Sequence, residues 1–139
     1  MVLLLGKWAN INAKDNGGRT LLSRAASNGH AAIVALLLSR KADVKTKDNG
    51  GQTLLYLASA NGHAAILRLL TKDADINAKD IFQQTPQHVD AQNGHVRIVT
   101  LLLGRKASVN ICDENGRTPL CLAAEYGHDE IVQLLRQIY

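Results

Sequence analysis

Three side chains near the middle of the chain could do metal chemistry. His88, Asp90 and His95 lie within residues 80–95, which read DIFQQTPQHVDAQNGH. Imidazole and carboxylate groups at short spacing are the ligands that Zn²⁺ or a non-haem iron takes, so a metalloenzyme using these three residues has to be considered. The rest of the chain decides whether the stretch is a site or an altered copy of something else.

Composition and charge indicate one soluble globular domain. The chain has 139 residues, about one domain's worth, and its apolar fraction of 46% is ordinary. The net charge is +4, and no run of five or more like charges marks a nucleic-acid-binding tail. An acidic protein partner is therefore slightly favoured, and a nucleic acid is not expected.

The first residues and the cysteines indicate an intracellular protein. MVLLLGKW has four consecutive apolar residues after Met1 and no basic segment before them, which is too short for a signal peptide's core or a membrane span. Cys112 and Cys121 form no Cys-x-x-Cys motif, so neither a disulfide framework nor a thiolate metal cluster is indicated. We expect a cytoplasmic or nuclear protein with no membrane contact, no metal and no cofactor.

Four versions of one phrase cover the chain. DNGGRTLLSRAASNGH at residues 15–30 recurs as DNGGQTLLYLASANGH at 48–63, in altered form at 80–95, and as DENGRTPLCLAAEYGH at 113–128. The copies are 33, 32 and 33 residues apart. We expect a single domain over 1–139, divided into a partial repeat at 1–14, full repeats at 15–47, 48–79 and 80–112, and a truncated C-terminal repeat at 113–139.

Each copy predicts two short helices followed by a polar turn. A threonine stands where its hydroxyl can accept a hydrogen bond from a free backbone N–H, and a glycine that can close the helix follows about nine residues later. A second helix carries apolar residues at i, i+3 and i+4, as at Ile98, Leu101 and Leu102. The turn-rich stretch before the next threonine suits an extended hairpin or loop.

A unit of this size cannot bury its apolar face alone, so the units must stack into an elongated array with a continuous core. The predicted fold is all-α, a helix-turn-helix solenoid with projecting β-hairpin or loop fingers. Basic residues near the ends of the second helices suit the helix dipole better than a phosphate-binding patch, because no aromatic platform accompanies them; they are Arg40, Lys41, Lys72, Arg105 and Lys106.

The last copy carries a family resemblance. GRTPLCLAAEYGHDEIVQLL, with its Thr-Pro-Leu, Ala-Ala, Gly-His and Ile-Val-x-Leu-Leu elements, closely resembles the ankyrin repeat, and so does the period of about 33 residues. The resemblance covers essentially the whole chain. It implies an ankyrin-type solenoid that acts as a protein-interaction scaffold, with turns and first helices lining a concave binding face, and it does not imply an enzyme. The identity of the partner is not a family property.

The resemblance also implies a set of binding residues. In ankyrin repeats the second, third and fifth residues of each copy, and the last two residues of the first helix, commonly meet partners. In this sequence these positions are Asn16, Gly17, Arg19, Ser27, Asn28, Asn49, Gly50, Gln52, Ala60, Asn61, Ile81, Phe82, Gln84, Gln92, Asn93, Glu114, Asn115, Arg117, Glu125 and Tyr126.

Most of these residues are small and polar, and Ile81, Phe82 and Tyr126 are the exceptions. An apolar pair at a finger tip, flanked by polar groups, is a candidate hot spot for binding. The alternative is that Phe82 folds back to shield a weakened third repeat.

The repeat also bears on the candidate metal ligands. A histidine follows the helix-closing glycine in every copy, and in the ankyrin family it bonds nearby backbone to hold the turn between the helices; here these are His30, His63, His95 and His128. His88 and Asp90 are two apart on a predicted helix, so they point to nearly opposite sides and cannot chelate together.

Three interpretations of function stay open. The first is a protein-interaction scaffold, expected as a monomer and as a possible fragment of a longer multidomain protein. The second is a structural array that associates end to end through apolar residues such as Val2–Leu5. The third, and least favoured, is the metalloenzyme.

The third copy departs from its sisters on one face. Gln87 and Asp90 stand where the other copies have leucine and alanine, and Gln83 replaces a turn glycine. A buried carboxylate costs several kcal/mol unless it is paired or protonated. We expect a Gln87–Asp90 hydrogen bond to offset part of this cost, and the first helix of this repeat to be loosened or displaced. The alternative is that water or a neighbouring group satisfies the carboxylate.

Overall fold

The computed structural model describes residues 10–70 and 75–138. These residues form eight helices, and consecutive helices make four antiparallel pairs. The pairs are α1 (Leu21–Ser27) with α2 (Ala31–Ser39), α3 (Leu54–Ala60) with α4 (Ala64–Leu70), α5 (Pro86–Asn93) with α6 (Val96–Gly104), and α7 (Pro119–Glu125) with α8 (Asp129–Arg136). The predicted all-α helix-turn-helix solenoid is confirmed. The apolar residues Val2–Leu5 and the basic Lys72 lie outside the described residues.

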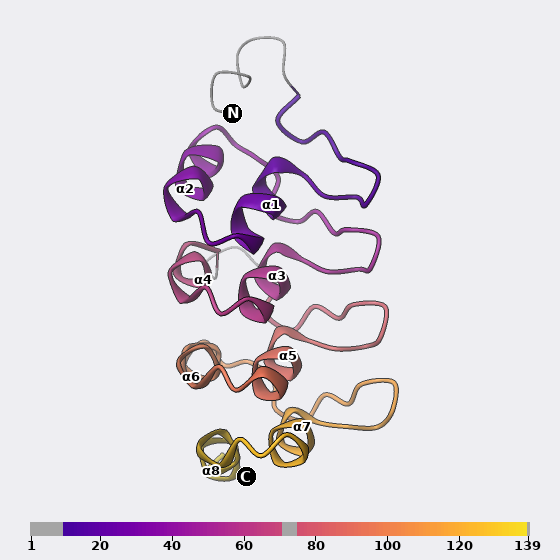
Figure 1. Cartoon of the computed structure of the whole chain (residues 1–139), viewed down its shortest axis with the longest axis vertical. Coiled ribbons are helices and arrows are strands. Elements are labelled where there is room, and N and C mark those ends of the chain that lie inside the picture. The colour runs from indigo at the N-terminus through magenta and orange to yellow at the C-terminus, as the bar shows by residue number, and fades with distance from the viewer. Residues whose placement is uncertain (1–9, 71–74, 139) are drawn as a thin grey trace.

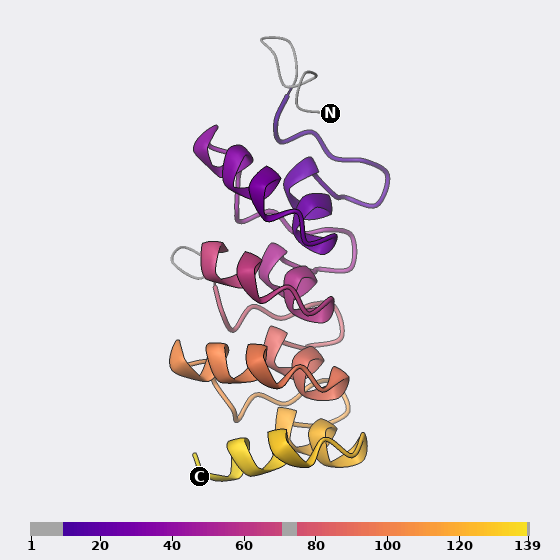
Figure 2. The same cartoon turned by 60° about the vertical axis from the view of Figure 1, so that its left-hand side comes forward.

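The four pairs stack along the long axis of the molecule (Figures 1 and 2). The first helices α1, α3, α5 and α7 form one column, in which each helix packs on the next. The second helices α2, α4, α6 and α8 form a parallel column beside it, and the polar loops project on the other side of the first helices (Figure 1). No described helix has the length and apolar character needed to cross a membrane.

Local hydrogen bonds explain where the first helices begin. In each repeat the threonine side chain accepts a bond from the backbone N–H three residues later, at 3.1 to 3.4 Å. This bond satisfies one of the amides that a helix leaves free at its start. The threonines are Thr20, Thr53, Thr85 and Thr118, as the sequence predicts.

The apolar core consists of two buried clusters, and both include residues of the third repeat. Leu22, Leu55 and Leu67 belong to one buried cluster that extends from α1 to Ile98 and Leu102 on α6. A second cluster, made of Ala91, Val99, Val109, Ala123, Ile131 and Leu135, joins α5 and α6 to the last repeat. Because each fully buried leucine or isoleucine contributes about 1.5–3 kcal/mol, stacking supplies stability that one pair of helices could not.

The projecting fingers are loops. In the first finger the Asp15 carboxylate accepts hydrogen bonds from the backbone N–H groups of Gly17 and Arg19, each at 2.9 Å. Within residues 10–70 and 75–138 the β-structure is limited to one isolated antiparallel bridge, Lys47–Thr53. A backbone hydrogen bond also crosses each turn, as from the N–H of Asp48 to the carbonyl of Gln52 at 3.1 Å, so the described fingers are loops with hairpin-like closure, within the predicted alternatives.

Adjacent fingers are joined by one backbone hydrogen bond each. The N–H of Asn49 donates to the carbonyl of Gly17 at 3.0 Å, and the N–H of Ile81 donates to Gly50 at 3.0 Å. The N–H of Glu114 donates to the carbonyl of Phe82 at 3.1 Å. The fingers therefore form a connected row along the stack.

The third repeat lies in register, so the expected displacement of its first helix is wrong. Helix α5 begins with a complete capping box at Thr85 and packs against both α3 and α7. The expected Gln87–Asp90 hydrogen bond is also absent, since both polar atoms of the Gln87 side chain are buried without a partner in the described structure. Close packing on both sides holds this helix despite its polar residues. Gln83 adopts the left-handed φ of 63° that the glycines of the other copies adopt.

Candidate binding face

The twenty predicted binding residues lie on the loops and at the C-terminal ends of the first helices, and none of them is buried. We call this surface the finger face. It comprises the finger loops and the ends of α1, α3, α5 and α7, on the side of the molecule where the loops project (Figure 1). Exposure alone does not distinguish a binding residue from a structural one, so their hydrogen bonds have to be compared.

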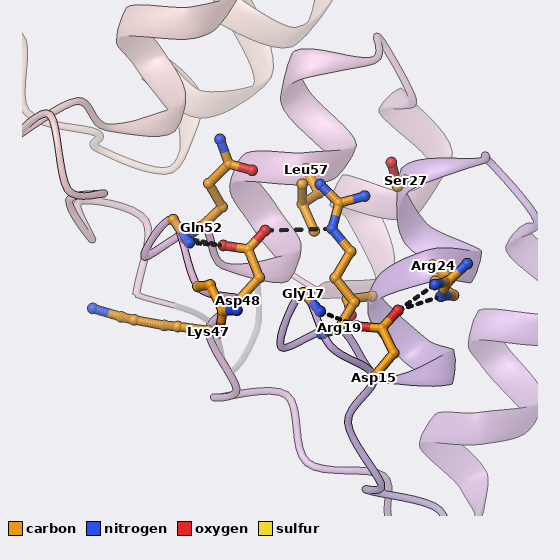
Figure 3. Close-up of polar contacts among 12 residues, drawn as sticks. Asp15, Gly17, Arg19, Arg24, Ser27, Lys47, Asp48, Gln52 and Leu57 are labelled. Atoms are coloured by element: carbon orange, nitrogen blue, oxygen red, sulfur yellow. Dashed lines mark hydrogen bonds and ion pairs between the residues drawn. The ribbon is translucent and has the colours of Figure 1, made fainter.

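In the first two repeats Arg19 and Arg24 are each paired with an aspartate (Figure 3). Arg19 reaches from the first finger to the second, where its Nε lies 3.4 Å from Oδ2 of Asp48. Arg24 on α1 returns to Asp15, with its Nε 3.0 Å from Oδ2. The backbone N–H of Arg19, and after it the Arg24 side chain, lower the pKa of Asp15 to about 2, so this carboxylate is ionised at neutral pH.

Three predicted asparagines join neighbouring repeats. The Nδ2 of Asn49 donates to the carbonyl of Asn16 at 2.9 Å, and the Nδ2 of Asn61 donates to Oγ of Ser27 at 3.1 Å. The Nδ2 of Asn93 donates to the carbonyl of Ala60 at 3.2 Å. These side chains already stabilise the stack, and a partner that bonded to them would have to replace those hydrogen bonds.

The third and fourth repeats bring predicted residues together in a depression of about 280 Å³, which we call the aromatic depression. Phe82 and Tyr126, 50% and 49% exposed, contribute its two aromatic rings. Its other lining residues are Gln84, Gln92, Asp113, Glu114, Asn115 and Arg117, so seven of the eight belong to the predicted set. Fingers and helix ends from two repeats therefore meet at one place.

Asp113 lies at the centre of the polar contacts in the aromatic depression, although it was not predicted as a binding residue. Its Oδ1 accepts from the backbone N–H groups of Asn115 and Arg117, and its Oδ2 lies 3.3 Å from Nε2 of Gln84 and 3.1 Å from Nε of Arg117. Burial opposes its ionisation, but the Arg117 backbone N–H and the Gln84 amide outweigh it and lower the pKa of Asp113. An aspartate begins the repeated phrase in all four copies, and this recurrence was the signal in the sequence that could have pointed to Asp113.

The aromatic depression is acidic. Arg117 uses its Nη1 on Oε2 of Glu125, at 3.3 Å, as well as its Nε on Asp113. The depression is also lined by Glu114, so its charged lining residues are two carboxylates, Asp113 and Glu114, and one guanidinium. The charge of Arg117 is therefore fully compensated, and an excess of negative charge remains near the two rings.

The candidate metal ligands do not converge. His88 is fully buried and uses both ring nitrogens, because Nδ1 accepts from the N–H of Thr85 at 3.1 Å and Nε2–H donates to the carbonyl of Arg117 at 2.9 Å. Burial lowers the pKa of His88, which fits this neutral form. Asp90 instead lies near His95. In the part of the chain that the structure describes, no group of three or more His, Cys, Asp or Glu side chains could hold a metal.

Three of the four recurring histidines, His63, His95 and His128, bond to the preceding repeat. His63 bonds to the carbonyl of Ser27 at 3.0 Å, and His128 bonds to the carbonyl of Gln92 at 2.8 Å. Both acceptors belong to the preceding repeat. The family resemblance implied a bond within the turn between two helices, and the structure shows that these bonds connect neighbouring repeats.

Comparison with known proteins agrees with this architecture. A family model described as ankyrin repeats (3 copies) matches residues 1–80 and again residues 77–138. The chain is similar to ankyrin repeat domain-containing protein 63 of Homo sapiens and to the protein of the same name from Mus musculus, with 58% identity over 41 residues in each. The match covers 30% of this chain, 11% of the human protein and 10% of the mouse protein, so it spans about a tenth of the length of these relatives.

Proposed function

The chain belongs to the ankyrin repeat family, a generic protein–protein interaction fold, and on that premise we propose that it is a non-catalytic scaffold. It binds a protein partner through the concave face of finger turns and first helices, which is the finger face. The whole of residues 1–139 is one ankyrin repeat domain in this proposal.

The observation that carries the proposal is the pair of half-exposed aromatic rings at the aromatic depression. Phe82 and Tyr126 are large side chains on a face where most other positions are small and polar. Aromatic residues in partly enclosed pockets dominate interface energetics, because they bury much area with little loss of conformational entropy. We therefore place the binding anchor there, with Ile81, also exposed, beside it.

Charge supports one class of contact at this anchor. The whole chain carries +4, yet the aromatic depression is acidic. A partner segment that enters it would meet the carboxylates of Asp113 and Glu114, while the Arg117 charge is already paired with Asp113 and Glu125, so a neutral or basic side chain is favoured over a carboxylate. The slight preference for an acidic partner, which net charge alone suggests, does not apply to this part of the surface.

The proposal includes an intracellular location and a monomeric state. Cys112 and Cys121 are both free and exposed, which fits a reducing compartment such as the cytosol or nucleus. We propose that the domain acts there as a monomer.

The test uses the protein as bait in a cell extract. The double variant Phe82→Ala, Tyr126→Ala is compared with the wild type and with Leu69→Ala, Ile138→Ala, which removes two exposed apolar side chains outside the aromatic depression. A partner that is retained by the wild type and the control, and lost from the aromatic variant at unchanged melting temperature, supports the proposal. Equal retention by all three proteins contradicts it. A lowered melting temperature of the single variant Phe82→Ala would support the alternative that Phe82 shields the third repeat.

A further inference from the structure

A second depression is lined by residues of α4 and α6 and by Arg105. These helices belong to the column of second helices, which lies on the opposite side of the first helices from the fingers (Figure 1). The depression has a volume of about 630 Å³ and runs along α6. Val96, Thr100 and Gly104 follow one another at four-residue intervals on that helix, which places them in one row, and Leu101 lies beside them. A Cβ added at Gly104 would meet nothing within 4 Å, so the row leaves open space above it. We call this feature the α6 groove.

Three arginines surround the α6 groove. Arg97 and Arg105 are eight residues apart, which corresponds to about 12 Å along a helix axis. Arg68 comes from α4 and is the counterpart of Thr100, because each lies five residues after the histidine of its own repeat. The three positive charges therefore stand at both ends and on one side of an apolar floor.

These arginines differ from those of the finger face in having no acidic partner. Arg19, Arg24 and Arg117 all make ion pairs. Within residues 10–70 and 75–138, the ion pairs include none of Arg68, Arg97 and Arg105, and all three are exposed. The groove therefore brings together three arginines that have no ion pair in the described structure, whereas Arg19 and Arg117 of the finger face are each paired with an aspartate.

We propose that the α6 groove docks an acidic amphipathic segment of a protein partner, independently of the finger face. The apolar floor would receive the apolar side chains of that segment, and the guanidinium groups would bind its carboxylates, for which their planar fork is well shaped. An α-helix of about eight residues spans the distance between Arg97 and Arg105.

Charge on the next second helix favours a protein segment over a membrane surface. Asp129 and Glu130, in the first turn of α8, are exposed in the same column. A broad anionic surface such as a lipid bilayer would meet these carboxylates as well as the arginines, whereas a short segment along α6 would meet only the arginines.

The test uses a synthetic probe. A fluorescein-labelled 16-residue peptide with leucines on one helical face and glutamates on the other is titrated with the protein, and binding is followed by fluorescence anisotropy. A matched peptide has glutamine in place of every glutamate. We expect the glutamate peptide to bind at least tenfold more tightly than the glutamine peptide. Similar affinities would overturn the proposal.

Two charge-reversal variants separate the groove from general electrostatics. Arg68→Glu with Arg97→Glu should weaken binding of the glutamate peptide at least tenfold. Arg40→Glu with Arg136→Glu makes the same change of net charge at exposed arginines of the first and last repeats, and it should weaken binding less than twofold. Equal losses of affinity in the two variants would show that peptide binding depends only on the net charge of the protein, and would overturn the proposal.

A third variant tests the groove itself. Gly104→Trp keeps all three arginines and fills the open space, so at least a fivefold loss of affinity is expected. Unchanged affinity would overturn the groove as the site. Phe82→Ala with Tyr126→Ala should leave peptide binding unchanged, so this proposal and the proposed function fail separately. Binding to phosphatidylserine vesicles is measured as well. If the wild type binds vesicles but not the peptide, and Arg68→Glu with Arg97→Glu abolishes vesicle binding, the groove is a lipid site and the proposal is wrong.

Discussion

The carboxylate Oδ1 of Asp90 lies 3.4 Å from Nδ1 of His95, and the same Nδ1 lies 3.0 Å from the carbonyl oxygen of Ser59 in the preceding repeat. Because both neighbours are acceptors, Nδ1 carries the proton and donates to each. His63 and His128 use Nε2 for the equivalent bond between repeats. The imidazole of the third repeat therefore serves both the stack and a buried carboxylate that the other repeats lack.

Removing this carboxylate should stabilise the protein. Asp90 is 0% exposed, its Oδ2 has no hydrogen-bond partner in the described structure, and burial raises its pKa to about 6 against the pull of His95. A pKa raised by about two units on folding corresponds to a loss of about 3 kcal/mol in the free energy of unfolding at neutral pH. We expect Asp90→Ala with Gln87→Leu, the residues of the sister copies, to raise the free energy of unfolding by about 3 kcal/mol in denaturant titrations.

The control for this prediction is Glu114→Ala, which removes an exposed carboxylate and should change stability by no more than about 0.5 kcal/mol. If the double variant melted no higher than the wild type, the buried carboxylate would not be a liability.

The stability of the wild type should also depend on pH through Asp90. Its pKa is higher in the folded protein, about 6 against 3.8, so the folded state binds the proton more tightly. The protonation of Asp90 therefore stabilises the folded state fully below about pH 4, and this stabilisation is lost as the pH rises through about 6. The pKa of His95 is raised by the same carboxylate, so its contribution is also lost as the pH rises through its folded value.

The isosteric variant Asp90→Asn removes this effect, together with the rise that Asp90 causes in the pKa of His95, and leaves the other titrating groups in place. The difference in unfolding free energy between the variant and the wild type should grow by about 3 kcal/mol between pH 4 and pH 7, in favour of the variant. Denaturant titrations at a series of pH values measure it. A difference that stays constant across this range would rule out a raised pKa for Asp90.

His88 should be important for stability. It is fully buried and joins Thr85 of its own repeat to the Arg117 carbonyl of the next. Truncation leaves a cavity and two unmade hydrogen bonds, so His88→Ala should lower the free energy of unfolding by about 3 kcal/mol. Cys121→Ala, at the equivalent exposed position of the fourth repeat, should cost less than about 1 kcal/mol. Equal effects on thermal melting would contradict the role of the bond between repeats.

Alanine variants of two glycines distinguish the cost of backbone strain from the cost of a lost contact between repeats. Gly94 and Gly127 have φ values of 77° and 76°, so alanine is strained at both positions. A Cβ at Gly94 would also approach Cε1 of His128 to 2.7 Å, whereas nothing lies within 4 Å of one at Gly127. We expect Gly127→Ala to cost about 1 kcal/mol and Gly94→Ala at least about 2 kcal/mol, because His128 must also leave the Gln92 carbonyl. Equal destabilisation in chemical unfolding would argue against that contact.

The helices could be predicted because the groups that define them are close together in the sequence. Thr85 bonds to the backbone N–H of residue 88, and Gly94 closes the helix that Thr85 begins. Such signals survive in every copy, so the period, the helix boundaries and the all-α solenoid follow from the residues alone. The residues of the finger face could be named in the same way, because their positions repeat with the period.

How the stacked repeats accommodate residues that depart from the repeat pattern could not be predicted from the sequence, because it depends on contacts between repeats. The sequence predicted a displaced helix at Asp90, but packing on α3 and α7 holds the helix in place and a histidine from the same repeat takes up one carboxylate oxygen. The aromatic depression likewise needs Gln84 and Asp113, 29 residues apart, to meet across two fingers.

What the sequence determined by itself is the repeating unit, because hydrogen bonds within a few residues choose helix, turn and helix. What the tertiary structure decided is which side chains of different units meet, which charges stay unpaired, and where the surface is hollow. Those properties depend on how one unit lies on the next. At the α6 groove, Arg68 stands across from Thr100 because α4 lies beside α6, and no short-range pattern in the sequence contains that contact.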